Sequence, residues 1–389
     1  MNDTLRIGVC GFGIAGGAAA VLLARAGHRV TLLERAPAVG PVGAGFLLQP
    51  SGQRVLAQLG LLERIVKNSA RIERIEAFTD EGRRLTRLGY DCAGKGACAY
   101  GVRRGVVFEA LHTAAIAAGV SMVLASDIRT VSEERESVFA NDDAGIAHGP
   151  FDLLIGADGS RSQLRQCLNP DEYRREYVHG ALWGSGRSAW PAYVLHQVAR
   201  GAKRLLGLLP LGGGQCAFFW GIRRDELEKI KARGFASFRE EAVEMCPSAA
   251  EVLDDIGSFE RLTFAGYLHS LPKRIHSRRV VLLGDAAHAM SPHLGQGANL
   301  ALLDAECLTR HLAISPLEAA LDAYAVERKS QSRYLALLSR WLSPFFQSES
   351  NLLGLGRDIA LPLLCAVPWT KRQMELTVTG AKRGFFDRL

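Results

Sequence analysis

The stretch "LRIGVCGFGIAGGAAAVLLARAGHRVTLLER", residues 5–35, decides the fold. A short apolar run is followed by a glycine-rich turn, a segment rich in alanine and leucine, and a second apolar run. In such a strand, loop and helix order, Gly11 permits the tight turn, Gly13 lets a pyrophosphate approach the backbone, and Gly16 lets helix and strand pack closely. The helix N-terminus adds N–H donors and a positive dipole. The stretch therefore predicts a dinucleotide-binding unit.

An acidic residue ends the second apolar run at the position such a unit requires. Glu34 lies 34 − 13 = 21 positions beyond Gly13, where a carboxylate accepts hydrogen bonds from an adenosine ribose. The motif alone does not choose between NAD and FAD, and a tight βαβ turn with a solvated Glu34 is the alternative interpretation. The cofactor contacts expected in this segment are Gly11, Gly13, Ile14, Ala15, Gly16, Glu34 and Arg35.

Two later stretches repeat the pattern of an apolar strand that breaks at glycine and aspartate before a helix. They are "FDLLIGADGSRSQLR", residues 151–165, and "VVLLGDAAHAMSPHLGQGANLALLDA", residues 280–305. Because ligands of open α/β sheets bind at the carboxyl ends of parallel strands, Asp158 and Asp285 are expected at one crevice with the glycine loop. An aspartate before a helix is often only an N-cap, which is the alternative for each of them.

With these motifs the chain resembles the class A flavoprotein monooxygenases, the para-hydroxybenzoate hydroxylase-like family that includes salicylate and hydroxynicotinate hydroxylases. The glycine loop matches its first fingerprint, residues 158–165 match its DGxxSxxR pattern, and residues 284–305 match its GD signature. In "VRRGVVFEAL", residues 102–111, Arg104 matches a flavin-contacting arginine, although Val107 replaces the usual leucine. The resemblance extends from residue 5 to about residue 345.

The resemblance implies FAD as the bound cofactor, with NAD(P)H as a transient co-substrate. Glu34 then binds the adenosine ribose, Asp285 the ribityl chain, and Asp158 lies near the pyrophosphate and the route of NAD(P)H. The turn that follows Pro292 presents backbone N–H groups to the N1–O2 edge of the flavin, where reduction places negative charge. The further cofactor contacts implied are Arg104, Asp158, Asp285, Gly295, Gly297, Ala298 and Asn299.

The implied activity is hydroxylation of a small electron-rich aromatic substrate with O₂, through a flavin C4a-hydroperoxide that survives only where water is excluded. Other reactions on the same fold stay open: epoxidation, ring-opening oxygenation and reduction of an isoprenoid double bond. A non-catalytic FAD-bound module that binds an unstable intermediate is the alternative outside enzymology. A disulfide reductase is not expected, because no paired redox cysteine motif is present.

The fold expected is α/β: a Rossmann-like FAD-binding domain of the glutathione reductase type, interleaved with an antiparallel β-sheet substrate domain and followed by C-terminal helices. The FAD-binding domain is assigned to residues 1–71, 100–176 and 266–345, and the substrate domain to residues 72–99 and 177–265, where alternating apolar runs with Gly and Pro turns indicate strands. Residues 346–389 form the C-terminal helical segment.

The substrate pocket is the least specified part of the sequence, and no catalytic base can be singled out. Strand alternation places Tyr193 and His196 on opposite faces, so only one of them is expected to face the pocket. The substrate-pocket candidates are Gln49, Tyr193, His196, Trp220 and Pro292.

Composition restricts the partners. The chain has 389 residues and a net charge of +7, but its basic residues are scattered, which favours small anionic molecules over nucleic acid. The eight cysteines indicate free thiols in a cytoplasmic protein, which we expect to be a monomer or homodimer. Residues 351–368 are too short and too charged to span a bilayer, although they could lie on one. No metal is expected, because His288 and His293, with Pro292 between them, do not share a helical face.

Overall fold

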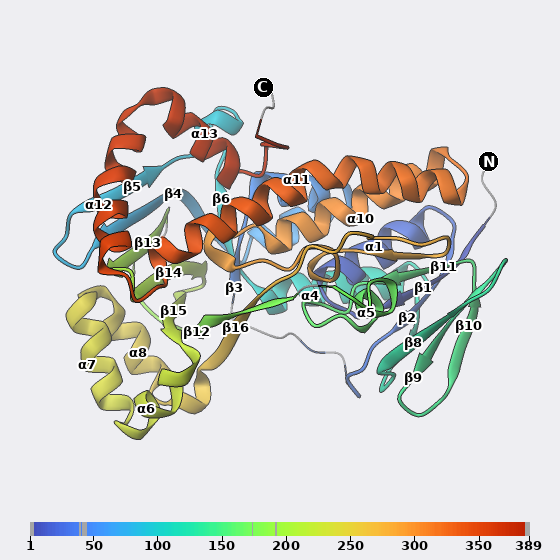
Figure 1. The fold of residues 1–389 in the computed structure, drawn as a ribbon, viewed down its shortest axis with the longest axis horizontal. Helices are drawn as coiled ribbons and strands as arrows, with labels where there is room; N and C mark the ends of the chain where they lie inside the picture. Colours follow the sequence, from blue (N-terminus) through green and yellow to red (C-terminus); the bar gives the residue numbers. More distant parts are fainter. Residues whose placement is uncertain (1–3, 39, 41–44, 173, 191–192, 386–389) are drawn as a thin grey trace.

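The computed structural model describes residues 4–38, 40, 45–172, 174–190 and 193–385. Within this part of the chain the strands form three sheets (Figure 1). The first, called here the parallel sheet, has the order β17-β11-β1-β2-β7, and all its neighbours run parallel. Its strands are β1 (Arg6–Cys10), β2 (Arg29–Leu33), β7 (Ser121–Val123), β11 (Leu153–Gly156) and β17 (Val280–Leu282).

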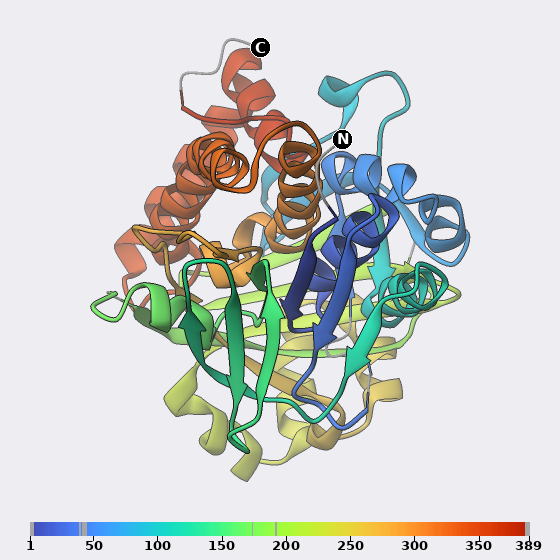
Figure 2. The same cartoon turned by 90° about the vertical axis from the view of Figure 1, so that its right-hand side faces the viewer.

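The parallel sheet lies between a helical layer and a small antiparallel sheet. The apolar residues of β1 and β11 alternate between two cores: Ile7 and Leu153 face the helices, whereas Cys10 and Leu154 face the small sheet. Figure 2 shows the small sheet in green in front of the blue strands of the parallel sheet. Its strands are β8 (Ile128–Glu133), β9 (Val138–Asp142) and β10 (Ala147–Phe151).

The helical layer packs around α1, whose alanines and glycines let neighbouring helices approach closely. Helices α4 and α10 pack against α1, and α11 packs against α10. The helices of the described chain are α1 (Ile14–Arg25), α2 (Pro50–Gln58), α3 (Leu62–Val66), α4 (Arg104–Ala117), α5 (Gln163–Leu168), α6 (Leu227–Ala232), α7 (Phe235–Met245), α8 (Ala250–Ile256), α9 (Asp285–His288), α10 (Gly297–Ile314), α11 (Leu317–Phe346), α12 (Asn351–Ala366) and α13 (Pro368–Val378). Short 3₁₀ turns are η1 (Asp91–Ala93), η2 (Arg224–Glu226), η3 (Pro247–Ala249), η4 (Phe259–Arg261) and η5 (Pro292–Leu294).

The third sheet, called here the large sheet, has the order β16-β12-β15-β14-β13-β4-β6-β3, with β5 paired to β4. All its neighbours run antiparallel except β13 and β4, which are parallel. The strands are β3 (Gly45–Leu48), β4 (Ala70–Thr79), β5 (Arg84–Leu88), β6 (Ala99–Arg103), β12 (Arg175–Arg187), β13 (Tyr193–Arg200), β14 (Arg204–Gly212), β15 (Gln215–Arg223) and β16 (Thr263–His269).

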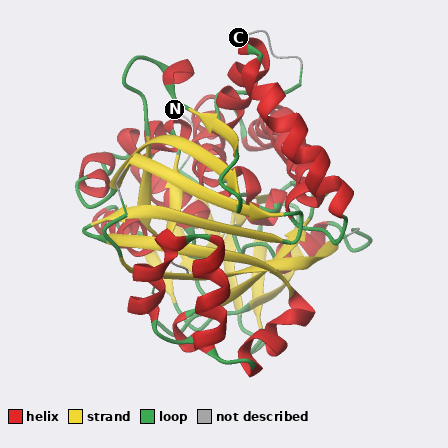
Figure 3. Cartoon of the chain, turned by 90° about the vertical axis from the view of Figure 1, so that its left-hand side faces the viewer, coloured by secondary structure: helices red, strands yellow, loops and turns green. Residues whose placement is uncertain are grey.

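Alternation along β14 and β15 gives the large sheet two different faces. Leu208 and Phe218 point into a core with helices α6–α8, which Figure 3 shows in front of the strands. Leu209, Leu211 and Ala217 point the other way, toward a core shared with β3 and α13. The second face is therefore the one turned toward the rest of the molecule.

The architecture confirms the predicted fold class, with a Rossmann-like unit, a large mostly antiparallel sheet and C-terminal helices. Strands β3 and β6 belong to the large sheet although the predicted boundaries assign them to the FAD-binding domain, so the exact division into domains stays a prediction. All eight cysteines are free thiols. No single helix in the described ranges is long and apolar enough to cross a membrane; only the α12 and α13 pair, bent by 102°, meets that length and composition together.

Candidate functional site

The glycine loop after β1 packs directly against the end of β11. Gly11 has a φ of +98°, and a Cβ on it would lie 2.6 Å from the carbonyl oxygen of Ala157. A Cβ on Gly16 would lie 1.9 Å from the carbonyl oxygen of Gly11, so no larger residue fits there. A Cβ on Gly13 would meet no atom within 4 Å. The loop is closed where helix and strand touch and open at Gly13, which is the space that a pyrophosphate needs.

Glu34 is held at the edge of the same loop. Its carboxylate accepts hydrogen bonds from the N–H groups of Phe12, at 2.7 Å, and Ala36, at 3.0 Å. These bonds fix the side chain of Glu34 beside the first turn, as a ribose contact requires. Arg35 follows it at the end of β2, and Ile14 and Ala15 begin α1.

The third motif meets the first across α1. Gly284 has a φ of +59°, and a Cβ on it would lie 3.0 Å from the Cβ of Ala15 and 3.3 Å from that of Ala301. The side chain of Asp285, which follows, is exposed. Its Oδ1 lies 3.6 Å from where a Cβ on Gly297 would be, so the carboxylate stands at the start of α10. The ends of β1, β11 and β17 therefore lie side by side at one edge of the parallel sheet, where the motifs place the cofactor crevice.

The turn before α10 is fixed by a buried amide. Asn299 is fully buried; its Oδ1 accepts from the N–H of Gln49 at 2.9 Å, and its Nδ2 donates to the carbonyl oxygens of Leu47 and Gly295, both at 3.1 Å. The side chain of Asn299 therefore ties β3 to the turn. The first backbone N–H groups of α10, those of Gly297, Ala298 and Asn299, have no acceptor within the helix and remain the candidate donors to a flavin.

Asp158 combines a structural role with a free acceptor. One carboxylate oxygen accepts from the N–H groups of Gln163, at 2.7 Å, and Leu164, at 3.2 Å, and so caps the start of α5. The other oxygen, Oδ1, is buried without a hydrogen-bond partner among the described residues. Burial raises the pKa of Asp158 above its ordinary value. The N-cap residue of α5 is Ser162, whose hydroxyl accepts from the N–H of Arg165, and Asp158 accepts from the first two N–H groups of the helix. The role of Asp158 toward a cofactor stays a prediction.

Arg165, the arginine of the second motif, connects that motif to the third, a role that the sequence did not reveal. It is fully buried and donates to the carbonyl oxygens of Asp285, at 3.2 Å, and Ser160, while Nε pairs with Glu172 at 3.0 Å. Arg165 lies in α5 and Glu172 follows that helix, so the acid seven residues after the arginine was the sequence signal for this pair.

A second buried cluster holds the third motif from behind. Asp304 is fully buried, and its Oδ2 accepts from the N–H of Gly284 at 2.8 Å and lies 2.6 Å from Nε2 of His288. Its Oδ1 accepts from Nε of Arg328 at 2.6 Å. Burial opposes ionisation, but His288 and Arg328 lower the pKa of Asp304 to about 2. Tyr324 adds a hydrogen bond to the carbonyl oxygen of Leu282 at 2.9 Å.

Helix α4 brings Arg104 toward the glycine loop. Phe12 of the loop packs edge-to-face on Phe108, with ring centroids 5.1 Å apart, and Val107 is fully buried beneath them. Arg104 is exposed at the first position of α4. Its contact with a flavin stays a prediction.

A buried polar pair lies on the inner face of the large sheet. Gln49 is fully buried, and neither its Oε1 nor its Nε2 has a hydrogen-bond partner within the described chain. The hydroxyl of Tyr90, which is 2% exposed, is likewise unpartnered. Burial raises the pKa of Tyr90, and the nearby Gln49 amide opposes that shift. Buried polar groups need partners, and the Gln49 amide and the Tyr90 hydroxyl lie close enough to act on each other. Both are therefore candidates for a ligand contact. Tyr90 was missed because residues 72–99 give no signal of what they face.

The other substrate-pocket candidates take different positions. Trp220 is fully buried and packs edge-to-face on Phe238 of α7 at 5.8 Å. His196 lies against Trp190, at 5.0 Å, on the same helix-covered face of the sheet, because its strand partner Leu208 belongs to that core. Both side chains thus pack on the face covered by helices α6–α8, and their contact with a substrate stays a prediction. Tyr193, at the start of β13, is half exposed with a φ of 105°.

Pro292 is exposed in η5, next to the turn that leads to α10. Its role in the substrate pocket stays a prediction. Ser291, which precedes it, is anchored by hydroxyl contacts to Ser339, at 2.6 Å, and Ser343, at 2.8 Å, both on α11. The turn is therefore pinned to the long C-terminal helix.

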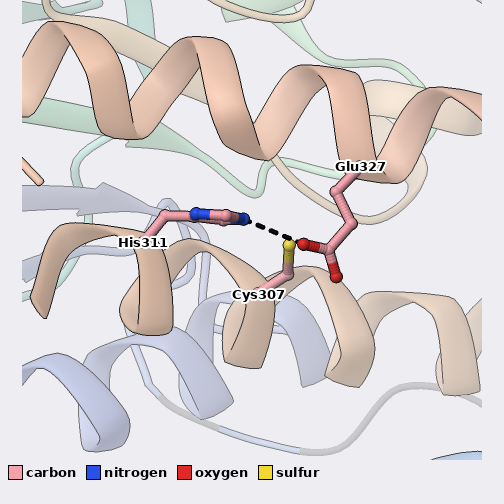
Figure 4. Close-up of side chains that lie close together, drawn as sticks. All are labelled: Cys307, His311 and Glu327. Carbon is pink, nitrogen blue, oxygen red and sulfur yellow. Dashed lines mark hydrogen bonds and ion pairs between the residues drawn. The ribbon is translucent and has the colours of Figure 1, made fainter. Parts of the chain in front are cut away.

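Cys307, His311 and Glu327 lie close enough together to hold a metal ion (Figure 4). The carboxylate of Glu327 is already engaged, with Arg310 at 2.7 Å and His311 at 2.9 Å. Burial raises the pKa of the Cys307 thiol to about 12, so it is a poor ligand at neutral pH. With a guanidinium beside it, the cluster is better explained as an ion pair that joins α10 to α11.

Comparison with known proteins identifies relatives of the whole chain. A family model described as "FAD binding domain" matches residues 4–336. The chain is 32% identical to 3-amino-4-hydroxybenzoate 2-monooxygenase of Streptomyces cremeus, over 81% of this chain and 80% of that protein. It is 31% identical to salicylate hydroxylase of Pseudomonas putida, over 91% of this chain and 89% of that protein. The crystal structure of Klebsiella pneumoniae HpxO in complex with FAD superposes with a TM-score of 0.82 at 21% identity, covering 97% and 99% of the two chains.

The geometry and the comparisons agree. The crevice offers space at Gly13, an unpartnered oxygen on Asp158 and an exposed carboxylate at Asp285, which suits a dinucleotide with a long polar chain. Since the family model spans most of the chain and relatives above 30% identity cover it almost fully, the chain belongs to the class A FAD-dependent aromatic monooxygenases.

Proposed function

We propose that this enzyme hydroxylates a small, electron-rich aromatic substrate, with NAD(P)H as reductant and O₂ as oxidant. The observation that carries the proposal is that the ends of β1, β11 and β17, each followed by a glycine or aspartate motif, lie at one edge of the parallel sheet, with open space at Gly13. When bound, FAD supplies the chemistry: two electrons from NAD(P)H and one oxygen atom of O₂ transferred to the substrate, with the other oxygen leaving as water.

The chain's own residues bind and orient the cofactor. The exposed carboxylate of Asp285 would accept hydrogen bonds from hydroxyl groups of the ribityl chain. The carboxylate of Glu34 would accept them from the adenosine ribose. The N–H groups at the start of α10 supply fixed dipoles that stabilise negative charge on the reduced flavin. Because Asn299 and Asp304 hold these loops from behind, the donors need no rearrangement when charge develops.

The substrate pocket is assigned to the inner face of the large sheet. Leu47, Leu211 and Ala217 belong to the buried apolar core on this face, which excludes water, and Tyr90 belongs to the same core. The buried amide of Gln49 follows β3 and is the other polar group proposed to contact the substrate. The raised pKa keeps the phenol of Tyr90 protonated at neutral pH, so it acts as a hydrogen-bond donor to a substrate oxygen or nitrogen, not as a general base.

The test is reconstitution and turnover of the purified protein. Its yellow colour and the flavin released on denaturation measure FAD occupancy, and oxidation of NADH and NADPH is followed with a panel of hydroxy- and amino-substituted aromatic acids. We expect consumption of reductant coupled to a product heavier by one oxygen atom. A flavin-loaded protein inert to every reductant would support the intermediate-binding module instead. Sedimentation of the same preparation distinguishes a monomer from a homodimer.

A further inference from the structure

Helices α12 and α13 lie at one outer edge of the molecule (Figure 1). The side chains of α12 and the start of α13 form an exposed apolar surface. Between residues 352 and 369, every exposed residue is apolar. The first and last residues of this range, Leu352 and Trp369, are 77% and 69% exposed. We call this set the apolar face. Its large members are Leu352, Leu355, Ile359, Leu363, Leu364, Val367 and Trp369.

The charged residues of α12 point inward, which is the reverse of an ordinary surface helix. Arg357 is 2% exposed and donates to the carbonyl oxygens of Gly201, at 2.9 Å, and Phe345, at 3.1 Å. Asp358 accepts from Arg357 at 2.6 Å and pairs with Arg83 at 3.5 Å. The helix is therefore anchored to the protein through its charges and turns its leucines outward. A continuous exposed patch of this kind indicates an interaction site.

The rim of the apolar face is basic. Strand β5 packs against α12 and carries Arg84, which is exposed, and Arg87, which is half exposed. At the other end Lys371 and Arg372 follow Trp369 on α13. Glu375 is largely buried and pairs with Lys371, and the exposed Glu349 before α12 pairs with Lys203 and Arg223. An apolar face inside a basic rim matches a phospholipid surface with anionic headgroups, where lysine and arginine meet phosphate and a tryptophan lies at the interface.

We propose that α12 lies in the plane of an anionic bilayer, with the apolar face inserted among the acyl chains and the basic rim at the headgroups. The helix has 16 residues, which at about 1.5 Å per residue is shorter than the ~30 Å hydrocarbon core. The chain also turns by 102° before α13. Both features suit an interfacial helix. A second copy of this chain fits less well, because a twofold axis through the face would bring two basic rims together.

The experiment uses the full-length, FAD-loaded protein in flotation with vesicles of phosphatidylcholine, with and without phosphatidylserine. We expect binding to the anionic vesicles, weaker binding to the neutral ones, and partial release by salt. The triple substitution Leu355→Gln/Ile359→Gln/Leu363→Gln should lower the partition constant at least about tenfold, since three inserted side chains are lost. The matched control, Ile314→Gln/Val326→Gln, changes two side chains that are 71% and 75% exposed outside the face, and should bind as the parent does.

A second variant tests the rim without touching the face. Arg84→Glu/Arg372→Glu should reduce binding to anionic vesicles to the level of neutral ones, and it keeps the proposal testable if the triple variant does not fold, as judged by circular dichroism and flavin content. Equal binding of the parent and both variants would overturn the proposal. So would a parent that ignores vesicles and sediments as a dimer that the triple substitution dissociates, because the face would then belong to a second copy.

Discussion

The buried cluster behind the third motif predicts that Asp304→Asn destabilises the whole FAD-binding unit. The carboxylate accepts from Gly284 and contacts His288 through one oxygen, and accepts from Arg328 through the other. Asparagine has almost the same shape but only one acceptor atom. In either amide orientation its NH₂ group therefore faces a donor, and the guanidinium of Arg328 loses its counter-charge in a fully buried site.

Breaking a buried ion pair by removing one partner costs about 3–5 kcal/mol. For a chain of 389 residues, an unfolding entropy of about 2.1 cal/mol/K per residue converts this into a Tm lower by roughly 4–6 °C. Because Asp304 also holds the N–H of Gly284, the residue before Asp285 and its proposed ribityl contact, FAD affinity should fall as well.

Thermal unfolding of the apoprotein measures the first effect, and titration of apoprotein with FAD measures the second. The control is Asp322→Asn: this carboxylate is 70% exposed and lies 3.4 Å from His276, so its loss should change stability by less than about 0.5 kcal/mol. If the two variants unfold at the same temperature, the ion pair of Asp304 with Arg328 does not stabilise the fold, which would refute the prediction.

Four further predictions concern single side chains. Gly16→Ala should lower both stability and FAD content, since its Cβ would lie 1.9 Å from a carbonyl oxygen. Gly13→Ala should abolish FAD binding but leave the Tm of the apoprotein unchanged, since its Cβ would meet no atom within 4 Å. A Gly13→Ala variant that still binds FAD would exclude the pyrophosphate site. Asp285→Asn should weaken FAD binding by roughly 10- to 100-fold, which corresponds to the loss of a hydrogen bond to a charged group. The stability of the apoprotein should not change. A fluorescence titration with FAD that gives the same affinity as the parent would contradict the ribityl contact. Tyr90→Phe should raise the KM for the aromatic substrate by up to about tenfold at full FAD content, because a hydrogen-bond donor to the substrate is lost. An unchanged KM would place the substrate elsewhere. Burial lowers the pKa of His293 from 6.5 to about 4, so the unfolded chain takes up a proton at higher pH than the folded protein does. The free energy of unfolding should therefore fall by up to about 3 kcal/mol between pH 6.5 and pH 4. His293→Gln should make stability less dependent on pH in that range, and a variant with the same dependence would show that His293 is not the group responsible.

The sequence predicted the cofactor crevice because its signals are local. A glycine loop, an aspartate after a strand and a helix start lie within a few residues of each other, and parallel strands bring their ends together without further information. The same holds for Gly11 and Gly16, whose need for glycine follows from contacts inside one βα turn.

The substrate pocket could not be predicted in the same way. Alternation shows that Trp220 shares a strand face with Phe218, but not which face helices α6–α8 cover, and those helices come later in the chain. Tyr90 meets Gln49 across 41 positions, and Asp304 meets Arg328 across 24. Contacts between residues so far apart in the sequence depend on how the sheets and helices stack, and the periodicity within one segment does not predict that stacking.

The two buried charge clusters hold the backbone of the loop that follows β17. Arg165 with Glu172 and Asp304 with Arg328 are costly to desolvate, and apolar residues in their place would make an equally compact core. What apolar residues cannot supply is directional hydrogen bonding to the backbone around Gly284 and Asp285. The clusters hold that backbone in one conformation, and they leave the carboxylate of Asp285 exposed to receive the cofactor. Their cost in desolvation is therefore best explained by the fixed loop that they produce, since a preorganised acceptor binds its ligand without first losing its own conformational freedom.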